Sequence, residues 1–216
     1  MAFDAYDDYE QSERVQKWLR QNGISIAVGV AVGLVAIFGW QQWRGHQANY
    51  QTQASALYQQ VQLYLTTGAD SKADAVIAQL QQDYANTPYA VFAASDRAQH
   101  LAQAKQLDKA QASLDWAEGH ATDPDLKALT QLRTAQLQLA RDKANDALGT
   151  LDRMPADSFK SMAQELRGDV LVKLGRPDDA RKAYQTAVSA LGKDTPTSGA
   201  LKMKIDDLAV AGKQGA

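Results

Sequence analysis

The sequence contains no cysteine and only three histidines, and it lacks the short motifs that mark common enzyme active sites. Without cysteine there is no disulfide, no thiolate nucleophile and no cysteine-bound zinc. His46, His100 and His120 each lack a second histidine or a carboxylate at metal-ligand spacing. No glycine-rich phosphate loop and no nucleophile elbow occurs. We therefore expect a protein that is not an enzyme and that holds no metal ion or cofactor.

The sequence also lacks an excess of either charge. It has 23 basic and 25 acidic residues, and after residue 44 the balance is 19 against 20. Proteins that bind nucleic acid carry a basic patch, and no such patch occurs here. We therefore expect no nucleic-acid partner.

Residues 24–40 lack charge altogether. They contain one hydroxyl, and nine of these residues are Ile, Val, Leu or Phe. As a helix, residues 23–40 would extend about 27 Å, close to the hydrocarbon thickness of a bilayer. Nine such side chains favour insertion by roughly 3 to 5 kcal/mol. The segment predicts an uncleaved transmembrane helix over residues 23–43, between a tail at 1–22 and a domain at 44–216.

Two other interpretations fit this segment less well. A cleaved signal peptide has a short basic leader and small residues at the cleavage site, whereas this leader is long and acidic. The segment ends in the bulky stretch Trp40-Gln41-Gln42-Trp43-Arg44, which offers no such site. A buried core helix would not stay uncharged on every face over this length.

Basic residues near the segment indicate its orientation. Arg14, Lys17 and Arg20 precede it, whereas only Arg44 follows within the next 20 residues. Because Lys and Arg concentrate on the cytoplasmic side, we expect a single-pass protein of the bacterial inner membrane. Residues 1–22 would then be cytoplasmic and the domain periplasmic.

Gly29 and Gly33 lie on one face of the predicted span, together with Ser25. Such a face lets another membrane helix approach closely, so Gly29 and Gly33 are candidates for a helix contact. Glycine is also common in membrane helices that make no such contact, and this alternative stays open.

After residue 45, alanine, glutamine and leucine dominate, and prolines fall between the apolar segments. This composition favours an all-α domain of antiparallel helices joined by short links. The apolar spacing predicts helices over residues 47–66, 73–84, 89–104, 108–119, 125–140, 143–153, 159–174 and 178–191.

A repeated pattern opens every second helix of the domain. Asp108-Lys109-Ala110, Asp142-Lys143-Ala144 and Asp178-Asp179-Ala180 are 34 and 36 residues apart, and apolar residues follow each alanine four and seven positions on. The third unit has the small and large positions of a tetratricopeptide repeat, with Gly168 and Tyr184 among them. Leu132 and Ala98 take the place of Gly168 in the earlier units. We therefore predict three to four repeat-like helix pairs that form an α-solenoid, with an irregular helical bundle as the alternative.

A solenoid of helix pairs can bind peptides on the face built from the first helix of each pair. Polar residues on the predicted first helices are therefore candidates for protein binding, although ordinary solvent exposure is the alternative for each. They are Arg133, Gln136, Glu165 and Asp169.

Several segments resemble those of the YfgM-type ancillary subunits of the bacterial Sec translocon, and they extend over nearly the whole chain. They are Lys17-Trp18-Leu19, Asn22-Gly23, Ala27-Val28-Gly29, Gly39-Trp40, Leu166-Arg167-Gly168-Asp169 and Met203-Lys204-Ile205-Asp206-Asp207-Leu208. The resemblance implies an inner-membrane protein with a periplasmic tetratricopeptide-repeat-like domain. It also implies association with the SecYEG translocon and with PpiD, a membrane-anchored chaperone. Such proteins are thought to pass exported polypeptides to periplasmic chaperones.

Anchored repeat domains serve many complexes, and the fold alone does not choose the partner. An anchored scaffold of another envelope complex, in cell division or in cytochrome maturation, is therefore the alternative function.

Overall fold

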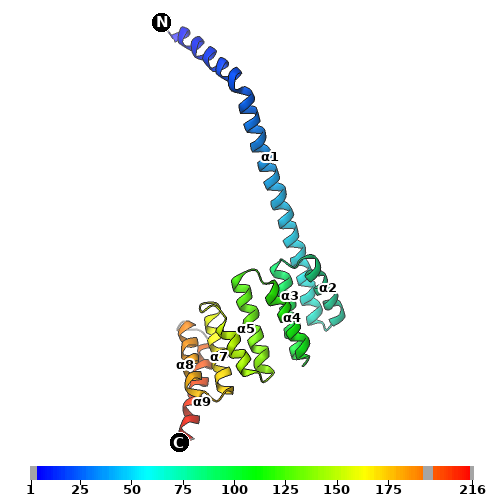
Figure 1. The fold of residues 1–216 in the computed structure, drawn as a ribbon, viewed down its shortest axis with the longest axis vertical. Coiled ribbons are helices and arrows are strands. Elements are labelled where there is room, and N and C mark those ends of the chain that lie inside the picture. Colours follow the sequence, from blue (N-terminus) through cyan, green and yellow to red (C-terminus); the bar gives the residue numbers. More distant parts are fainter. Residues whose placement is uncertain (1–3, 192–196, 215–216) are drawn as a thin grey trace. The chain divides into compact units, whose positions relative to one another are not determined.

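The computed structural model describes residues 4–191 and 197–214, and all regular elements within these ranges are α-helices. The chain divides into two compact units, Met1–Thr52 and Gln53–Ala216. The helices, in chain order (Figure 1), are α1 (Asp4–Thr66), α2 (Asp70–Asp83), α3 (Pro88–Gln103), α4 (Leu107–His120), α5 (Pro124–Ala140), α6 (Ala144–Asp152), α7 (Lys160–Lys173), α8 (Pro177–Ala190) and α9 (Thr197–Gln214).

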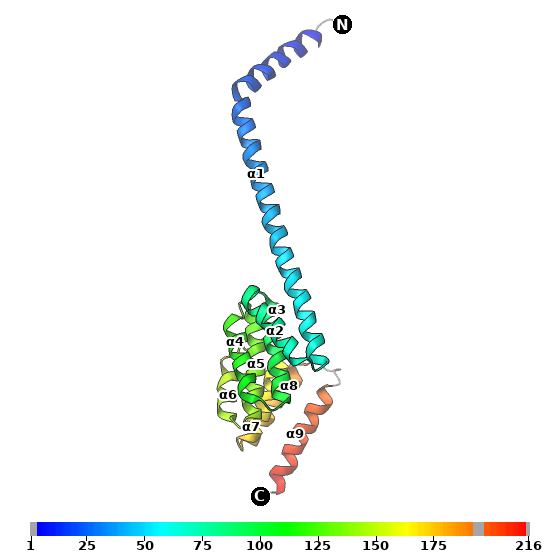
Figure 2. The ribbon, with the colours of Figure 1, turned by 90° about the vertical axis from the view of Figure 1, so that its right-hand side faces the viewer.

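The first unit consists of α1 as far as Thr52, and it exposes apolar side chains such as Ile24, Val35 and Phe38. Among the described residues, no single helix is long and apolar enough to cross a bilayer. Two parts of α1, Arg14–Ser25 and Ala27–Thr66, pass that test only as a pair, with a bend of 47° between them (Figure 2). The span over residues 23–43 therefore stays a prediction. So does the tail, because the side chains of residues 1–13 lie outside the described set.

The second unit is built from antiparallel helix pairs. The end of α1 packs with α2 and α3 around buried residues such as Ala54, Val61 and Ile77. Farther along the chain, α3 pairs with α4, α5 with α6 and α7 with α8. The first helices of successive pairs also touch, since α3 contacts α5 and α5 contacts α7. The second helices α4 and α6 lie along one edge of the stack (Figure 2). The predicted all-α solenoid is confirmed.

Every pair is closed by the same turn after its first helix. One residue of each turn has a positive φ: Gly68 (71°), Lys105 (57°), Asp142 (60°) and Gly175 (70°). The residue after it donates its N–H to a carbonyl near the end of the first helix, at 2.9 Å in all four turns. This six-to-one bond satisfies a carbonyl that a helix end leaves free. The recurrence of the turn shows that the end of α1 and α2 form a true first pair.

The turns correct the predicted register of one unit. The turn residue is Asp142 itself, and α6 begins at Ala144, so Asp142-Lys143-Ala144 does not correspond to Asp108-Lys109-Ala110. Counted from the turn, the equivalent stretch is Asn145-Asp146-Ala147. The prediction was wrong because an Asp-Lys-Ala triplet occurs by chance three residues too early.

With the corrected register, each pair buries the same three positions along its second helix, spaced by four and three residues, although the last of them in the third pair, Met154, lies two residues beyond the end of α6. This spacing places them on one helix face. They are Ala73, Ile77 and Leu80; Ala110, Leu114 and Ala117; Ala147, Leu151 and Met154; and Ala180, Tyr184 and Ala187.

Three of the first helices, α3, α5 and α7, have a small residue at the equivalent position, whereas α1 has Val61 there. Ala98, Ala135 and Gly168 each lie seven residues before the turn residue, and all three are buried. Leu132 was therefore the wrong equivalent of Gly168. The approach is closest in the last pair, where a Cβ added to Gly168 would lie against the Tyr184 ring, 2.7 Å from its Cζ.

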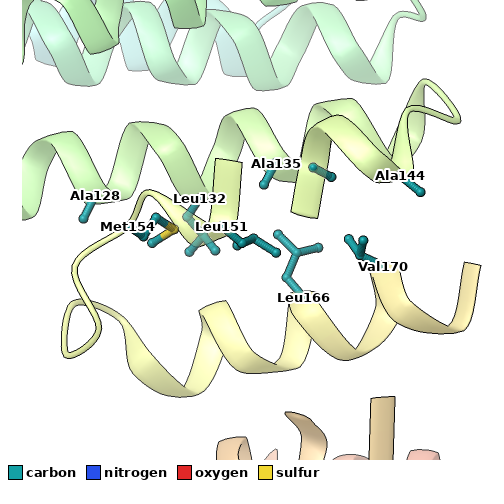
Figure 3. Packing of buried hydrophobic residues seen from close by; sticks show 9 residues of the cluster. Ala128, Leu132, Ala135, Ala144, Leu151, Met154, Leu166 and Val170 are labelled. Atoms are coloured by element: carbon teal, nitrogen blue, oxygen red, sulfur yellow. The ribbon is translucent and has the colours of Figure 1, made fainter. Parts of the chain in front are cut away.

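The core continues from pair to pair without a break. Figure 3 shows Leu166 and Val170 of α7 pointing toward Leu132 of α5 and Leu151 of α6. Burial of such side chains stabilises each by about 1.5–3 kcal/mol relative to exposure. The interface between neighbouring pairs is therefore as much a part of the core as the interior of each pair.

Helix α9 was not among the predicted helices. It packs on α8 in the way that α5 packs on α4 and α7 on α6. Its Leu201 is fully buried in a cluster with Leu171 and Tyr184. Helix α9 thus occupies the place of a further first helix and covers the end of the stack.

Candidate binding groove on the first helices

A chain of polar side chains links three successive first helices. The Tyr58 hydroxyl of α1 donates to Asp96 Oδ2 of α3 at 2.7 Å. From α5, Arg133 Nη1 donates to Asp96 Oδ1 at 3.1 Å. Each oxygen of the Asp96 carboxylate therefore has a partner on a different helix.

The environment keeps the Tyr58 hydroxyl protonated. Partial burial raises the pKa of Tyr58, and the hydrogen bond to Asp96 raises it further, because a negative phenolate beside a carboxylate is unfavourable. Gln62 donates to the same hydroxyl at 2.9 Å. The Tyr58 side chain is thus held in one orientation, as donor to Asp96.

A cavity of about 270 Å³ lies between α3 and α5. Its apolar lining consists of small side chains and two leucines, and its polar lining of one hydroxyl, one guanidinium and two amides. The lining residues are Ser95, Ala98, Gln99, Ala102, Leu114, Arg133, Gln136, Leu137 and Ala140. This cavity is called the α3–α5 groove below.

A second cavity, of about 540 Å³, lies between the end of α1 and α3. Gln99 lines both cavities, so they adjoin along α3. The other lining residues are Gln62, Leu65, Thr66, Asp96, His100 and Gln103. Together the two cavities cross three first helices, and their lining combines apolar side chains with amides and the Asp96–Arg133 ion pair.

The six residues singled out from the sequence fall into three places. Arg133 and Gln136 both line the α3–α5 groove. Gly29 and Gly33 lie on α1 in the first unit. Apart from the neighbouring turns of α1 itself, no atom of the described residues lies within 4 Å of a Cβ added at either glycine.

Glu165 and Asp169 lie on α7 beneath α9. Lys204 of α9 donates to Glu165 Oε1 at 3.0 Å and to Asp169 Oδ1 at 2.8 Å. The Tyr184 hydroxyl of α8 also donates to Asp169 Oδ1, at 2.7 Å. The two carboxylates therefore bind the terminal helix of their own chain.

Charge dominates this cluster. Burial on its own would lower the pKa of Lys204, but hydrogen bonds and attraction from Asp169 and Glu165 outweigh it and raise that pKa. Burial and the hydrogen bond to Asp169 likewise raise the pKa of Tyr184. Both groups remain protonated at neutral pH and keep α9 attached.

Two of the three histidines have local partners. His100 Nε2 lies 3.0 Å from Asp70 Oδ1, and His120 Nδ1 lies 2.8 Å from the carbonyl oxygen of Trp116. The His120 ring also stacks on the Trp116 ring, with centroids 4.0 Å apart. In the part of the chain that the structure describes, no group of three metal-ligating side chains occurs.

Sequence reasoning missed Ser95, Asp96 and Gln99. The position of Gln99 could have been found from Gln136, since both lie six residues before a left-handed turn residue. That signal required the position of the turns, and two of the four turn residues, Lys105 and Asp142, are not glycine.

A stack of antiparallel helix pairs, in which first helix lies beside first helix, defines a helical-repeat protein of the α-solenoid class. The family model for the tetratricopeptide repeat-like domain matches residues 16–210. The chain belongs to this family, and within it to the YfgM-type proteins.

Curated relatives match along nearly the full length of the chain. The ancillary SecYEG translocon subunit of Escherichia coli (strain K12) is 31% identical over 94% of this chain and 98% of its own length. The protein of the same name from Haemophilus influenzae is 31% identical, with 87% of this chain and 91% of its own covered. That from Neisseria gonorrhoeae is 25% identical, with 89% of each chain covered. The resemblance noted from the sequence is confirmed.

Proposed function

We propose that this protein is a non-catalytic scaffold of the Sec translocon that links exported polypeptides to periplasmic chaperones. The observation that carries the proposal is the full-length similarity to proteins named ancillary SecYEG translocon subunits. Similarity confined to the repeats would support the fold alone, but here it extends into the apolar segment that would hold the protein beside the channel. The partners in this proposal are the SecYEG translocon, a PpiD-type chaperone and exported polypeptides.

Anchoring in the inner membrane is part of the proposal. The exposed apolar side chains of α1 include Ile24, Val35 and Phe38, and a bilayer would remove them from water. Trp40 and Trp43 follow, with ring centroids 5.4 Å apart, and tryptophan favours the headgroup layer. Three basic residues before the segment and one after it support a cytoplasmic N-terminus and a periplasmic domain.

Co-purification tests the translocon association. Full-length protein with a C-terminal affinity tag is solubilised from membranes in mild detergent, and co-purified proteins are identified by mass spectrometry. We expect SecY and a PpiD-type chaperone to be enriched over an untagged control. Their absence would refute the proposal, and enrichment of cell-division or cytochrome-maturation proteins in their place would support the other scaffold function.

Protease protection tests the topology separately. In spheroplasts, protease added outside should degrade residues 44–216 and leave an epitope in residues 1–22 intact until the membrane is lysed. A domain that resists protease until lysis, although the purified protein is digested under the same conditions, would contradict the proposed orientation.

A further inference from the structure

The part of α1 that precedes the uncharged segment is amphipathic. Val15, Trp18 and Leu19 are spaced by three and one residues, and a helix turns by about 100° per residue, so the three side chains lie on one face. Each of them is more than half exposed. Lys17 and Arg20 lie on the opposite face of the same turns. Residues 14–22 therefore combine an apolar face with a basic face, and they are called the leading helix below.

The apolar face of the leading helix adjoins the segment that a bilayer would enclose. Residues 24–40 begin directly after it, and their apolar side chains, such as Ile24 and Val28, are exposed as well. A bilayer that covers those side chains has its headgroup layer beside residues 14–22. The lipid that covers the one apolar surface is therefore within reach of the other.

The charge of the sequence changes sign where the leading helix begins. Residues 4–13 contain five acidic residues and no basic one, whereas residues 14–22 contain three basic residues and no acidic one. An anionic lipid surface attracts the second set of charges and repels the first. The change of sign therefore sets the N-terminal limit of a lipid contact at residue 14.

The basic face has donors to offer. In the described part of the chain, Lys17 and Arg20 have neither a hydrogen bond nor an ion pair. A hollow of about 770 Å³ lies beside the leading helix, lined by Gln16, Lys17, Leu19 and Arg20. Two cations and an amide donate hydrogen bonds of the kind that phosphate oxygens accept, and the leucine adds an apolar contact. This lining suits a phospholipid headgroup.

The bend in α1 inclines the leading helix toward the plane of such a membrane. Arg14–Ser25 and the part of α1 that begins at Ala27 meet at 47° (Figure 2). Val15 precedes Gly23 by eight residues, or about 12 Å along a helix. With the uncharged segment along the bilayer normal, the bend reduces the rise of this length above the hydrocarbon to about 8 Å, close to the thickness of the headgroup layer.

We propose that residues 14–22 form an interfacial helix that binds anionic phospholipids in the leaflet next to the N-terminus. Val15, Trp18 and Leu19 insert among the headgroups, and the long side chains of Lys17 and Arg20 bind lipid phosphates. The inference rests on the membrane anchoring in the proposed function and adds a second lipid contact to it. This contact holds the anchor at one depth and one tilt in the bilayer.

The test uses spin labels, which the absence of cysteine makes site-specific. Full-length protein is prepared with a single substitution, Val15→Cys, Leu19→Cys, Gln21→Cys or Val35→Cys, and is labelled with a nitroxide. It is placed in nanodiscs of phosphatidylcholine alone or of phosphatidylcholine mixed with the anionic phosphatidylglycerol. Power saturation then compares the access of oxygen, which concentrates in hydrocarbon, with that of a water-soluble nickel chelate.

The order of accessibility distinguishes an interfacial helix from an upright one. In anionic nanodiscs, we expect the labels at Val15 and Leu19 to be about threefold or more less accessible to the nickel chelate than the label at Gln21. Gln21 is the nearest of the three to the uncharged segment. A helix that continued upright into water would therefore give the reverse order.

The lipid charge and the two basic residues should each control the contact. The ratio of the shielded to the aqueous component in the spectrum of the Leu19 label should fall about tenfold or more in the double variant Lys17→Gln with Arg20→Gln. Phosphatidylcholine alone should lower this ratio as well. The matched control, Lys109→Gln with Lys127→Gln, removes the same charge at exposed lysines of the second unit and should change nothing.

Three results would overturn the inference. They are equal nickel access at Leu19 and Gln21, equal shielding in neutral and anionic nanodiscs, and shielding that occurs in native membranes but not in nanodiscs, which would identify a protein as the occupant. Because the lipid comparison leaves both basic residues in place, it holds even if the double variant folds poorly.

The Val35 label separates this inference from the proposed function. If that label is shielded from nickel and accessible to oxygen while the label at Leu19 is not shielded, the interfacial helix is refuted and the anchor is supported. A Val35 label that is open to the nickel chelate would refute the anchor itself, and the interfacial helix with it.

Discussion

Replacing Gly168 by alanine is expected to destabilise the last helix pair. The added Cβ would lie against the Tyr184 ring, so that the ring or its helix would have to shift. Tyr184 is almost fully buried, its hydroxyl is bonded to Asp169, and Lys204 lies 5.4 Å from the ring centroid. Relief of the contact would therefore disturb both the core and the attachment of α9.

The expected change in the free energy of unfolding is the sum of two destabilising effects and one stabilising effect. Overpacking in a core costs about 1–3 kcal/mol. A weakened bond between Tyr184 and the partly exposed Asp169 adds about 1 kcal/mol. Alanine in place of glycine within a helix returns about 1 kcal/mol. The net loss is about 1–3 kcal/mol, or about 2–12 °C in Tm for a chain of this length.

Thermal unfolding followed by circular dichroism measures the effect on the purified protein in detergent. The matched control is Gly149→Ala in α6, where nothing lies within 4 Å of the added Cβ. That control should raise Tm by a few degrees, since only the helix-propensity gain remains. In a Tyr184→Leu background, Gly168→Ala should likewise become neutral or stabilising. A rise in Tm for Gly168→Ala on its own would refute the reasoning.

Three further predictions concern the ends and turns of the stack. Lys204→Ala should speed hydrogen exchange in residues 197–214 about fivefold, since the partly exposed ion pairs of Lys204 with Glu165 and Asp169 are worth about 1 kcal/mol. The control is Lys202→Ala, at an exposed lysine of the same helix. Equal exchange in the two variants would contradict the role of Lys204. The folded state raises the pKa of Tyr58 and of Tyr184 above the ordinary value of 10.0. The protonated hydroxyls therefore stabilise the fold fully below about pH 10, and this stabilisation is lost as the pH rises further, so the free energy of unfolding should fall above about pH 10. In the double variant Tyr58→Phe with Tyr184→Phe, the free energy of unfolding, measured by urea titrations at several pH values, should fall less steeply with pH. Equal slopes for the variant and the unaltered protein would count against this role of the two hydroxyls. Gly175→Ala should cost about 1–2 kcal/mol in the same titrations, because φ is 70° there, and an unchanged midpoint would show that the turn tolerates a side chain.

The positions of the helices were predicted well from the sequence, because the apolar spacing indicates where each helix runs and the turn residues indicate where it ends. Residues 89–104 and 178–191 were predicted as helices, and the structure has Pro88–Gln103 and Pro177–Ala190. In both cases a proline stands at the first helical position, where its missing N–H costs nothing. Local signals of this kind depend on a few neighbouring residues and are therefore readable from the sequence.

The exact register and the surroundings of the candidate residues were not readable in this way. Asp142-Lys143-Ala144 has the residue pattern that begins the other second helices, but Asp142 is a turn residue with a φ of 60°. An aspartate in the sequence does not by itself indicate this left-handed conformation. Glu165 and Asp169 were expected on an open face, yet Lys204, more than thirty positions along the chain, is bonded to both. Such a contact depends on where α9 packs, and that packing follows from the tertiary fold.

The position of α9 has a consequence for assembly. A repeat array that ended on α8 would present Leu171 and Tyr184 as an adhesive surface, ready to receive the first helix of another copy. Head-to-tail growth of that kind generates filaments. With Leu201 already buried there, α9 covers the surface on which such growth would begin.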